Sequence, residues 1–161
     1  MLVTLIWTLF FALSHTTFAS NSTSPPPPPA PKVDFSALPP SAAVRPVNQD
    51  DSPHQVIARL ILDRAELRPG ETARLGLHLT QDVGWHTYWK SIVEVGQPTD
   101  IQWGLPERYI STPYDYPIPQ RFDTMGIVSF GYDKEVLLFT NITVPEDAKP
   151  GSITLTATAG W

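Results

Sequence analysis

The chain has 161 residues, which is enough for one domain and too few for two of ordinary size. It contains no cysteine, which excludes disulfides, cysteine-based zinc sites, iron–sulfur clusters and a cysteine nucleophile in the chain as given. Hydrophobic residues make up 42% of the chain and charged residues 17%, a composition that favours a packed core over disorder. The net charge of -5 gives no electrostatic support for a nucleic acid partner.

Residues 1–20 predict a secretory signal peptide. An apolar run extends from Leu2 to Leu13, although no Lys or Arg precedes it. Its twelve residues are too few to span a bilayer as a helix, which needs about 20. The segment Thr17-Phe18-Ala19 places small residues at the -3 and -1 positions of a cleavage site. We therefore expect the protein to be periplasmic or secreted, and membrane-attached if the natural chain continues.

Residues 21–53 predict a disordered, proline-rich linker. Ten of the 18 prolines of the chain lie between Pro25 and Pro53, and the first five of them are consecutive. Proline removes backbone donors, and the stretch has too little apolar content to offset the entropy of ordering. An extended, semi-rigid tether is expected.

Residues 54–161 predict an all-β, immunoglobulin-like antiparallel sandwich. In Thr72 to Thr80, apolar and polar residues alternate with a period of two, as in a strand with one wet face. The other candidates are separated by Pro, Gly and Asp clusters, and no window shows a sustained helical period. Further strands are predicted at Val56–Leu62, Trp85–Lys90, Ile101–Leu105, Ile127–Tyr132, Val136–Val144 and Ile153–Trp161.

The predicted strand Trp85–Lys90 is the part of the chain richest in functional side chains. Alternation would place its two tryptophans on one face and an imidazole, a phenol and an amine on the other. The tryptophans of the domain are predicted to be core anchors because each buries a large area. The opposite face is either a partner-contact surface or a solvated one. The predicted anchors are Trp85, Trp89, Trp103 and Trp161, and the possible contact residues are His86, Tyr88 and Lys90.

An ordered series of short motifs carries a family resemblance. Leu67-Arg68-Pro69-Gly70-Glu71 is followed by Gly84-Trp85-His86-Thr87-Tyr88-Trp89 and by Ile101-Gln102-Trp103-Gly104-Leu105-Pro106, and the chain ends in Ala159-Gly160-Trp161. Together these motifs resemble the N-terminal periplasmic domain of the DsbD/ScsB family of thiol:disulfide interchange proteins. The resemblance covers residues 54–161.

The resemblance implies an electron-passing domain outside the cytoplasmic membrane. Such domains accept electrons through a cysteine pair from a transmembrane reductase domain and pass them to periplasmic thiol/disulfide proteins, for disulfide reduction or cytochrome c maturation. In related proteins the tryptophan that matches Trp161 is followed almost at once by the first cysteine. No position of this chain matches a family cysteine, so we expect no catalytic residue, no cofactor and no redox activity in the chain as given.

Two interpretations of the C-terminal end are open: a truncated chain, or a complete protein that kept the scaffold and lost the chemistry. The strand Ile153–Trp161 is still in phase at its last residue, with Ile153, Leu155, Ala157, Ala159 and Trp161 expected to face inward. Ending such a strand on a bulky aromatic residue leaves apolar surface and a strand edge uncovered. This pattern favours truncation.

Other functions remain as alternatives. The chain is in that case a secreted β-sandwich that binds a protein, a small ligand or copper without redox chemistry. His78 and His86 are weak candidates for metal ligands, but a solvated strand face for His78 and a partly buried polar position for His86 are favoured. The sequence has no Ser/His/Asp signature, no phosphate-binding glycine loop and no basic stripe.

Overall fold

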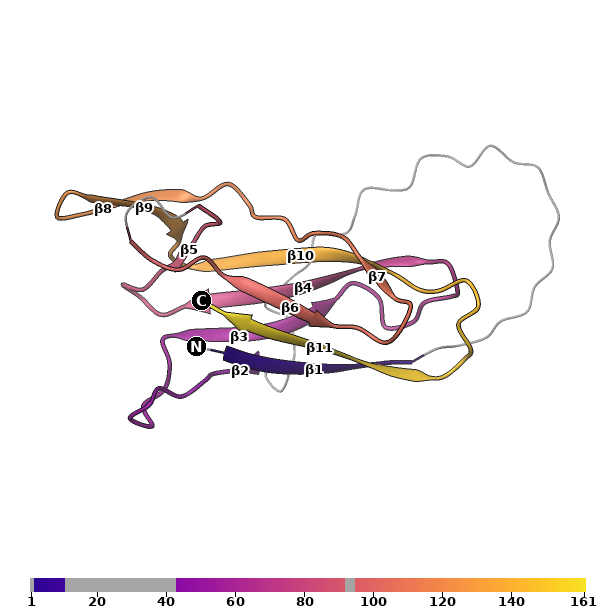
Figure 1. Cartoon of the computed structure of the whole chain (residues 1–161). Helices are drawn as coiled ribbons and strands as arrows, with labels where there is room; N and C mark the ends of the chain where they lie inside the picture. Colours follow the sequence, from indigo (N-terminus) through magenta and orange to yellow (C-terminus); the bar gives the residue numbers. More distant parts are fainter. Residues whose placement is uncertain (1, 11–42, 92–94) are drawn as a thin grey trace.

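A computed structural model of the chain describes residues 2–10, 43–91 and 95–161. These residues form eleven strands joined by turns and loops (Figure 1). The predicted all-β, immunoglobulin-like sandwich is confirmed. Within the described residues, no helix is long and apolar enough to cross a membrane.

The larger sheet has five antiparallel strands with β4 at its centre. Strand β4 pairs with β3 on one side and with β10 on the other, where nine residue pairs run from Thr80 opposite Glu135 to Thr72 opposite Thr143. The order across this sheet is β2 (Ala43–Val44), β3 (Val56–Leu62), β4 (Thr72–Gln81), β10 (Glu135–Thr143) and β7 (Ile110–Ser111).

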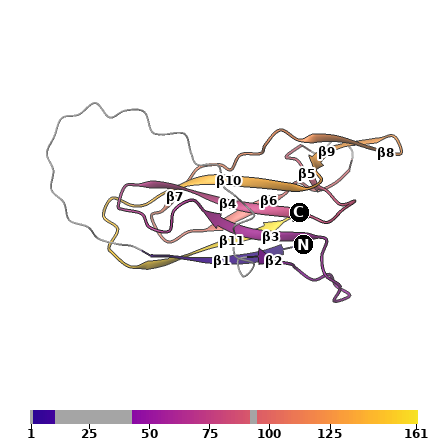
Figure 2. The ribbon, with the colours of Figure 1, turned by 180° about the vertical axis from the view of Figure 1, so that it is seen from behind.

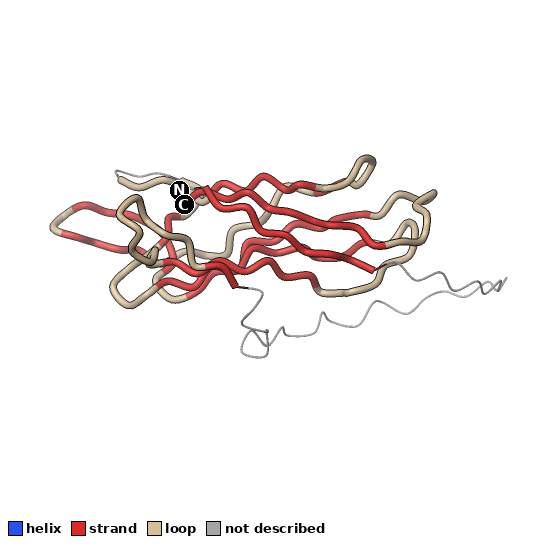
Figure 3. Tube along the Cα trace, turned by 90° about the horizontal axis from the view of Figure 1, so that it is seen from below, coloured by secondary structure: helices blue, strands red, loops and turns tan. Residues whose placement is uncertain are grey.

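A three-stranded sheet faces the larger one, as the view from below shows (Figure 3). Strand β11 (Ser152–Gly160) lies in its middle, between β1 (Leu2–Phe10) and β6 (Asp100–Gly104). Strand β1 lies within the predicted signal peptide, and cleavage of that segment stays a prediction.

The core lies between these two sheets. Its members alternate along each strand because successive side chains point to opposite faces. In β11, Leu155, Ala157 and Ala159 are fully buried, as the inward phase of this strand predicted. The opposing sheet contributes apolar residues of three strands, among them Leu60, Leu75, Leu77, Leu79, Leu138 and Ile142.

A second three-stranded sheet extends from one end of the sandwich (Figures 1 and 2). It consists of β5 (Thr87–Tyr88), β9 (Ile127–Tyr132) and β8 (Gln120–Thr124), in that order. Met125 and Gly126 form the two-residue turn between β8 and β9, and both have positive φ, 53° and 86°. Positive φ at both central positions is the signature of a type I′ turn, which matches the twist of the flanking strands.

The strand predictions hold well for the long strands and less well for the short ones. Strands β3 and β9 have the predicted bounds, β4 is one residue longer at its C-terminal end, and β6, β10 and β11 each begin and end one residue earlier than predicted. The predicted strand Trp85–Lys90 is reduced to Thr87–Tyr88. The short strands β2, β7 and β8 were not predicted, and β1 was predicted only as part of a signal peptide.

The predicted linker boundary at Pro53 needs correction. Residues 43–53 belong to the folded domain, because Ala43 and Val44 pair with β3 and Val47 bridges to Pro53. The last residues of a proline-rich stretch can be ordered when they pair with the edge of a sheet and form hydrogen bonds with polar side chains. Residues 21–42 of the predicted linker lie outside the described residues.

Candidate functional site

Three distant parts of the sequence meet at one end of the sandwich. Val56, at the start of β3, lies opposite Gln81, at the end of β4. In the facing sheet, Gly160 at the end of β11 lies opposite Asp100 at the start of β6. Trp161 follows Gly160 directly, and its indole is in ring contact with His54, two residues before β3, so the C-terminus lies at this end of the sandwich (Figure 1).

The imidazole of His54 packs against the indole of Trp161. The ring centroids are 5.9 Å apart and the planes are inclined by 77°, an edge-to-face contact. The Nδ1 atom of His54 accepts a hydrogen bond from the backbone N–H of Val56 at 3.1 Å. Since Nδ1 is an acceptor, the proton of the neutral ring lies on Nε2. Burial lowers the pKa of His54, with a smaller contribution from the positive charge of Arg45, so the ring is neutral at pH 7.

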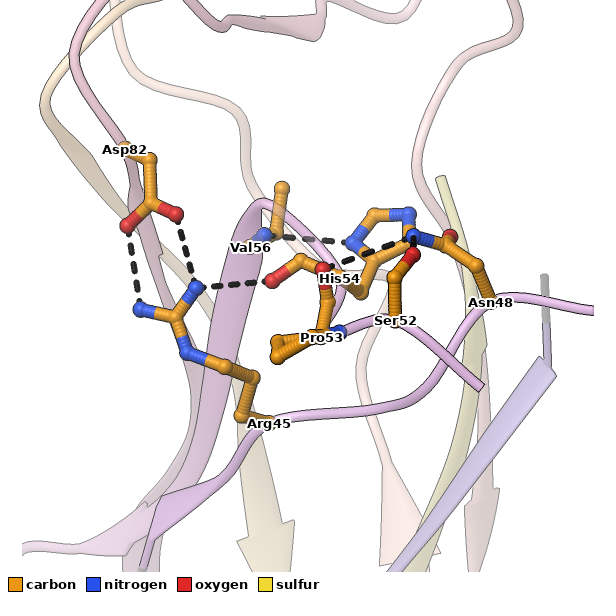
Figure 4. Close-up of polar contacts among 7 residues, drawn as sticks. All are labelled: Arg45, Asn48, Ser52, Pro53, His54, Val56 and Asp82. Atoms are coloured by element: carbon orange, nitrogen blue, oxygen red, sulfur yellow. Dashed lines mark hydrogen bonds and ion pairs between the residues drawn. The ribbon is translucent and has the colours of Figure 1, made fainter. Parts of the chain in front are cut away.

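Arg45 fixes this segment in place (Figure 4). Its guanidinium donates two hydrogen bonds to the carboxylate of Asp82, at 2.7 and 3.0 Å, and a third to the carbonyl of His54 at 2.8 Å. The hydrogen bonds from Arg45 hold the pKa of Asp82 below its usual range. Asn48 closes the intervening loop by donating to the hydroxyl of Ser52 at 3.0 Å. Arg45 therefore ties the segment that carries His54 to the loop after β4.

The loop after β4 explains why one predicted core anchor is wrong. The backbone N–H of Trp85 donates to the carbonyl of Asp82 at 3.0 Å, and Gly84 has a φ of 85°. This turn ends strand alternation before Trp85, whose side chain is 53% exposed. The other three predicted anchors, Trp89, Trp103 and Trp161, are partly buried and pack against the core.

Of the three possible contact residues that follow this turn, two lie in one cluster and the third lies apart from it. His86 stacks on Phe122 of β8, with centroids 4.6 Å apart and planes inclined by 16°, and meets the ring of Tyr88 edge-on at 4.9 Å. The ammonium of Lys90 lies instead over the ring of Trp89, 5.1 Å from its centroid. His86 and Tyr88 thus form an aromatic cluster with Phe122, and Lys90 does not share it.

The second predicted histidine, His78, has different neighbours. It lies in β4 with a side chain only 5% exposed, and its Nε2 is 3.0 Å from a carboxylate oxygen of Glu135. Burial lowers the pKa of His78, and the hydrogen bond to Glu135 opposes that effect. The described residues contain no group of three or more side chains that suits a metal ion. Metal binding by His78 and His86 stays a prediction.

Tyrosine hydroxyls fasten the long connection between β6 and β8. Tyr116 donates to the carbonyl of Thr99, and Tyr132 donates to the carbonyl of Pro117 at 2.7 Å. Burial raises the pKa of Tyr132 to about 12, so its hydroxyl remains protonated at neutral pH. These bonds hold the connection against the end of the sandwich that carries the aromatic cluster.

Two site residues were not identified as such from the sequence. Arg45 falls in the predicted linker, and His54 is the first residue of the predicted sandwich. Arg45 is separated from its partner Asp82 by 37 residues, and no local pattern signals such a pairing. Phe122 is 36 positions from His86, and no sequence pattern indicates that the two rings stack.

Comparison with known proteins identifies the family. Residues 58–161 match the profile of the N-terminal domain of the thiol:disulfide interchange protein DsbD. The match covers most of the chain, and the chain therefore belongs to the family of DsbD N-terminal domains, as its motifs predicted.

A solved structure resembles the chain, and no curated protein matches it. It is the crystal structure of the N-terminal periplasmic domain of ScsB from Proteus mirabilis, with 24% sequence identity and a TM-score of 0.48. The similarity covers 72% of this chain and 45% of the ScsB chain, so the chain corresponds to less than half of the length of that structure.

Proposed function

We propose that the chain is a periplasmic scaffold domain of the electron-passing type found in DsbD-like thiol:disulfide interchange proteins, and that as given it docks on redox partners without exchanging electrons. One observation carries this proposal. The family match extends across nearly the whole sandwich, while the 161 residues contain no cysteine.

The chemistry supports the negative part of the proposal. Disulfide exchange begins when a thiolate attacks a disulfide sulfur, and a second thiol then resolves the mixed disulfide. No hydroxyl or imidazole side chain replaces these two thiols, because neither cycles between a dithiol and a disulfide. The chain therefore has the scaffold and the surface at the end of the sandwich, but not the two thiols that the reaction needs.

The surface offers features suited to contact with another protein. Trp85 is half exposed, and Val83 in the loop after β4 and Met125 in the turn between β8 and β9 are exposed. Aromatic residues and methionine are enriched at protein interfaces. The aromatic cluster of His86, Tyr88 and Phe122 joins the segment after Trp85 to β8. The partners implied by the family are the transmembrane reductase domain and periplasmic thiol/disulfide proteins.

Competition in a reconstituted system tests this proposal. The purified chain is added to a DsbD-type transmembrane reductase that reduces its own cysteine-containing N-terminal domain. We expect the rate of reduction to fall as the concentration of the chain rises, because both domains dock on the same surface. A Trp85→Ala/His86→Ala/Tyr88→Ala variant should lose the inhibition, while Lys90→Ala, whose side chain lies over Trp89, should keep it. An unchanged rate at all concentrations would argue against docking.

A binding module without any redox partner is the second candidate. The exposed apolar side chains of Val83, Trp85 and Met125 favour a protein ligand for it. The same variants separate the two functions. A chain that fails to compete in the reductase assay, yet binds a defined protein through His86 and Tyr88, would support the second candidate.

The location is part of the proposal, because the chain begins with a predicted signal peptide. Fusion of alkaline phosphatase, which is active only after export, to the C-terminus tests it. We expect phosphatase activity with residues 1–20 present and none when residues 2–13 are deleted. Equal activity of both fusions would contradict export by this segment.

A further inference from the structure

The outer edge of β11 is covered by a single strand. β1 pairs with all nine residues of β11, from Leu2 opposite Gly160 to Phe10 opposite Ser152. On its other side β11 pairs with β6 through residues 156–160. Removal of β1 would therefore open the whole edge of β11.

The sequence of β11 has none of the features that protect an exposed edge. Natural edge strands are kept short or carry charges or proline, which discourage pairing with other chains. In the other sheets that the structure describes, β2 and β7 have two residues each, and β8 carries Arg121 and Asp123. Strand β11 is nine residues long and has no charge and no proline. If its edge were exposed, β11 would therefore be prone to pair with a strand of another chain.

Strand β1, which covers this edge, belongs to the segment that is also predicted to be a signal peptide. Residues 2–10 fall within the apolar stretch that predicts a removable signal peptide. We propose that β1 is a replaceable cover, and that in its absence the edge of β11 pairs with β11 of a second copy of the chain. This proposal is independent of redox chemistry and of the docking surface proposed above.

The geometry of the edge favours a second copy as the occupant. The edge accepts an antiparallel strand, and Ile6 lies opposite Thr156 at the middle of the nine pairs. A two-fold axis at Thr156 would pair β11 with itself in the same antiparallel sense, with Ser152 opposite Gly160 of the second copy. Self-pairing brings no like charges together, because β11 has none.

The side chains are also compatible with self-pairing. Leu155 and Ala157 remain directed into their own core, where they are fully buried. On the opposite face Thr156 would meet itself, and Thr154 would meet Thr158 of the second copy. Cross-strand threonine pairs are favourable. The dimer would join two sandwiches through one continuous sheet.

Proline in β1 of the full chain tests the proposal. Amides of neighbouring residues in a strand point to opposite sides, so Leu5→Pro/Ile6→Pro removes at least one donor to β11 and blocks pairing. The matched control, Ser22→Pro/Thr23→Pro, adds the same two prolines outside both strands. By sedimentation velocity, we expect the parent and the control to be monomeric and the β1 variant to be dimeric.

Single cysteines then test the register, because the parent chain has no cysteine to interfere. In the proline variant, Thr156→Cys should form a disulfide-linked dimer, since opposite residues of an antiparallel pair lie within disulfide range. Thr154→Cys should cross-link at least ~10-fold less, because its opposite residue is Thr158 of the second copy. A mixture of Thr154→Cys and Thr158→Cys chains should restore cross-linking.

Each other outcome overturns the proposal. A monomeric proline variant with the circular dichroism spectrum of the parent would show that no second copy takes the edge. Equal cross-linking at positions 154 and 156 would show a different interface. The milder variant Ile6→Pro, with a single proline, tests whether the chain still folds when pairing of β1 is weakened. If both proline variants lose the β-sheet spectrum, β1 is an integral strand and not a replaceable cover.

Discussion

His54 and Trp161 are 107 positions apart in the sequence and in ring contact in the fold, with centroids separated by 5.9 Å. This contact joins residues 43–54, which precede β3, to Trp161. Arg45 fixes the position of His54, because its guanidinium donates hydrogen bonds both to the carbonyl of His54 and to the carboxylate of Asp82. The end of the sandwich is thus built by residues that lie outside the strands themselves.

Tryptophan substitutions should separate core anchors from surface residues. Trp103→Ala should lower the free energy of unfolding by at least about 2 kcal/mol, because this indole packs against the core. Trp85→Ala should change it by no more than ~0.5 kcal/mol, since its side chain is 53% exposed. Urea unfolding followed by circular dichroism measures both. Equal losses in the two variants would show that Trp85 is an anchor after all.

Mild acid should destabilise the fold through two histidines. The pKa values of His54 and His78 are lowered in the folded state, mainly by burial, from a reference of about 6.5. The unfolded chain therefore takes up protons first as the pH falls. The stability that these groups contribute is complete above about pH 6.5 and declines below it, down to the folded pKa values.

The urea midpoint at about pH 7.5 and about pH 5.5 measures this effect. We expect a lower midpoint in acid for the parent and a smaller decrease for His78→Gln. If His78→Gln loses as much stability on acidification as the parent does, His78 is not one of the groups responsible.

Alkaline conditions should act through Tyr132. Its pKa is raised to about 12 by burial, whereas an unfolded tyrosine ionises near 10. Its contribution to stability is complete below about pH 10 and is lost as the pH rises toward 12. Tyr132→Phe should cost about 1 kcal/mol at pH 7, because the Pro117 carbonyl loses its donor, and should lose less stability between pH 9 and 11 than the parent. An equally steep alkaline loss in the variant would contradict this role.

The stack of His86 on Phe122 should be detectable by NMR. A ring 4.6 Å away and nearly parallel shifts the imidazole protons of His86 upfield. Phe122→Leu should remove this shift and lower the free energy of unfolding by about 1 kcal/mol. Lys90→Ala should leave the imidazole shifts unchanged. Unaltered His86 resonances in Phe122→Leu would show that the two rings do not stack in solution.

The long strands could be predicted from the sequence because burial on one face imposes a period of two. Strand β4 illustrates this, since Ala73, Leu75, Leu77 and Leu79 are all buried. The same rule failed at Trp85, where the turn at Asp82 to Gly84 interrupts the strand. Two-residue strands such as β2 and β7 carry no periodic signal, and their existence depends on a neighbouring edge.

The candidate site was predictable only in part. His86 and Tyr88 were predicted to share a face because they lie two positions apart, and their rings are in contact, while their role as partner-contact residues stays a prediction. The pairs Arg45 with Asp82 and His54 with Trp161 arise from the packing of distant segments, which residue patterns do not record. The family, in contrast, was recognisable because its motifs occur in a fixed order along the chain.

Reduction of insulin disulfides by the purified full chain, with reduced glutathione as the electron donor, tests the central claim most directly. A domain of the DsbD N-terminal family without a cysteine should leave the rate equal to that of glutathione alone. A rate that rises in proportion to the concentration of the chain would show redox catalysis and contradict the account.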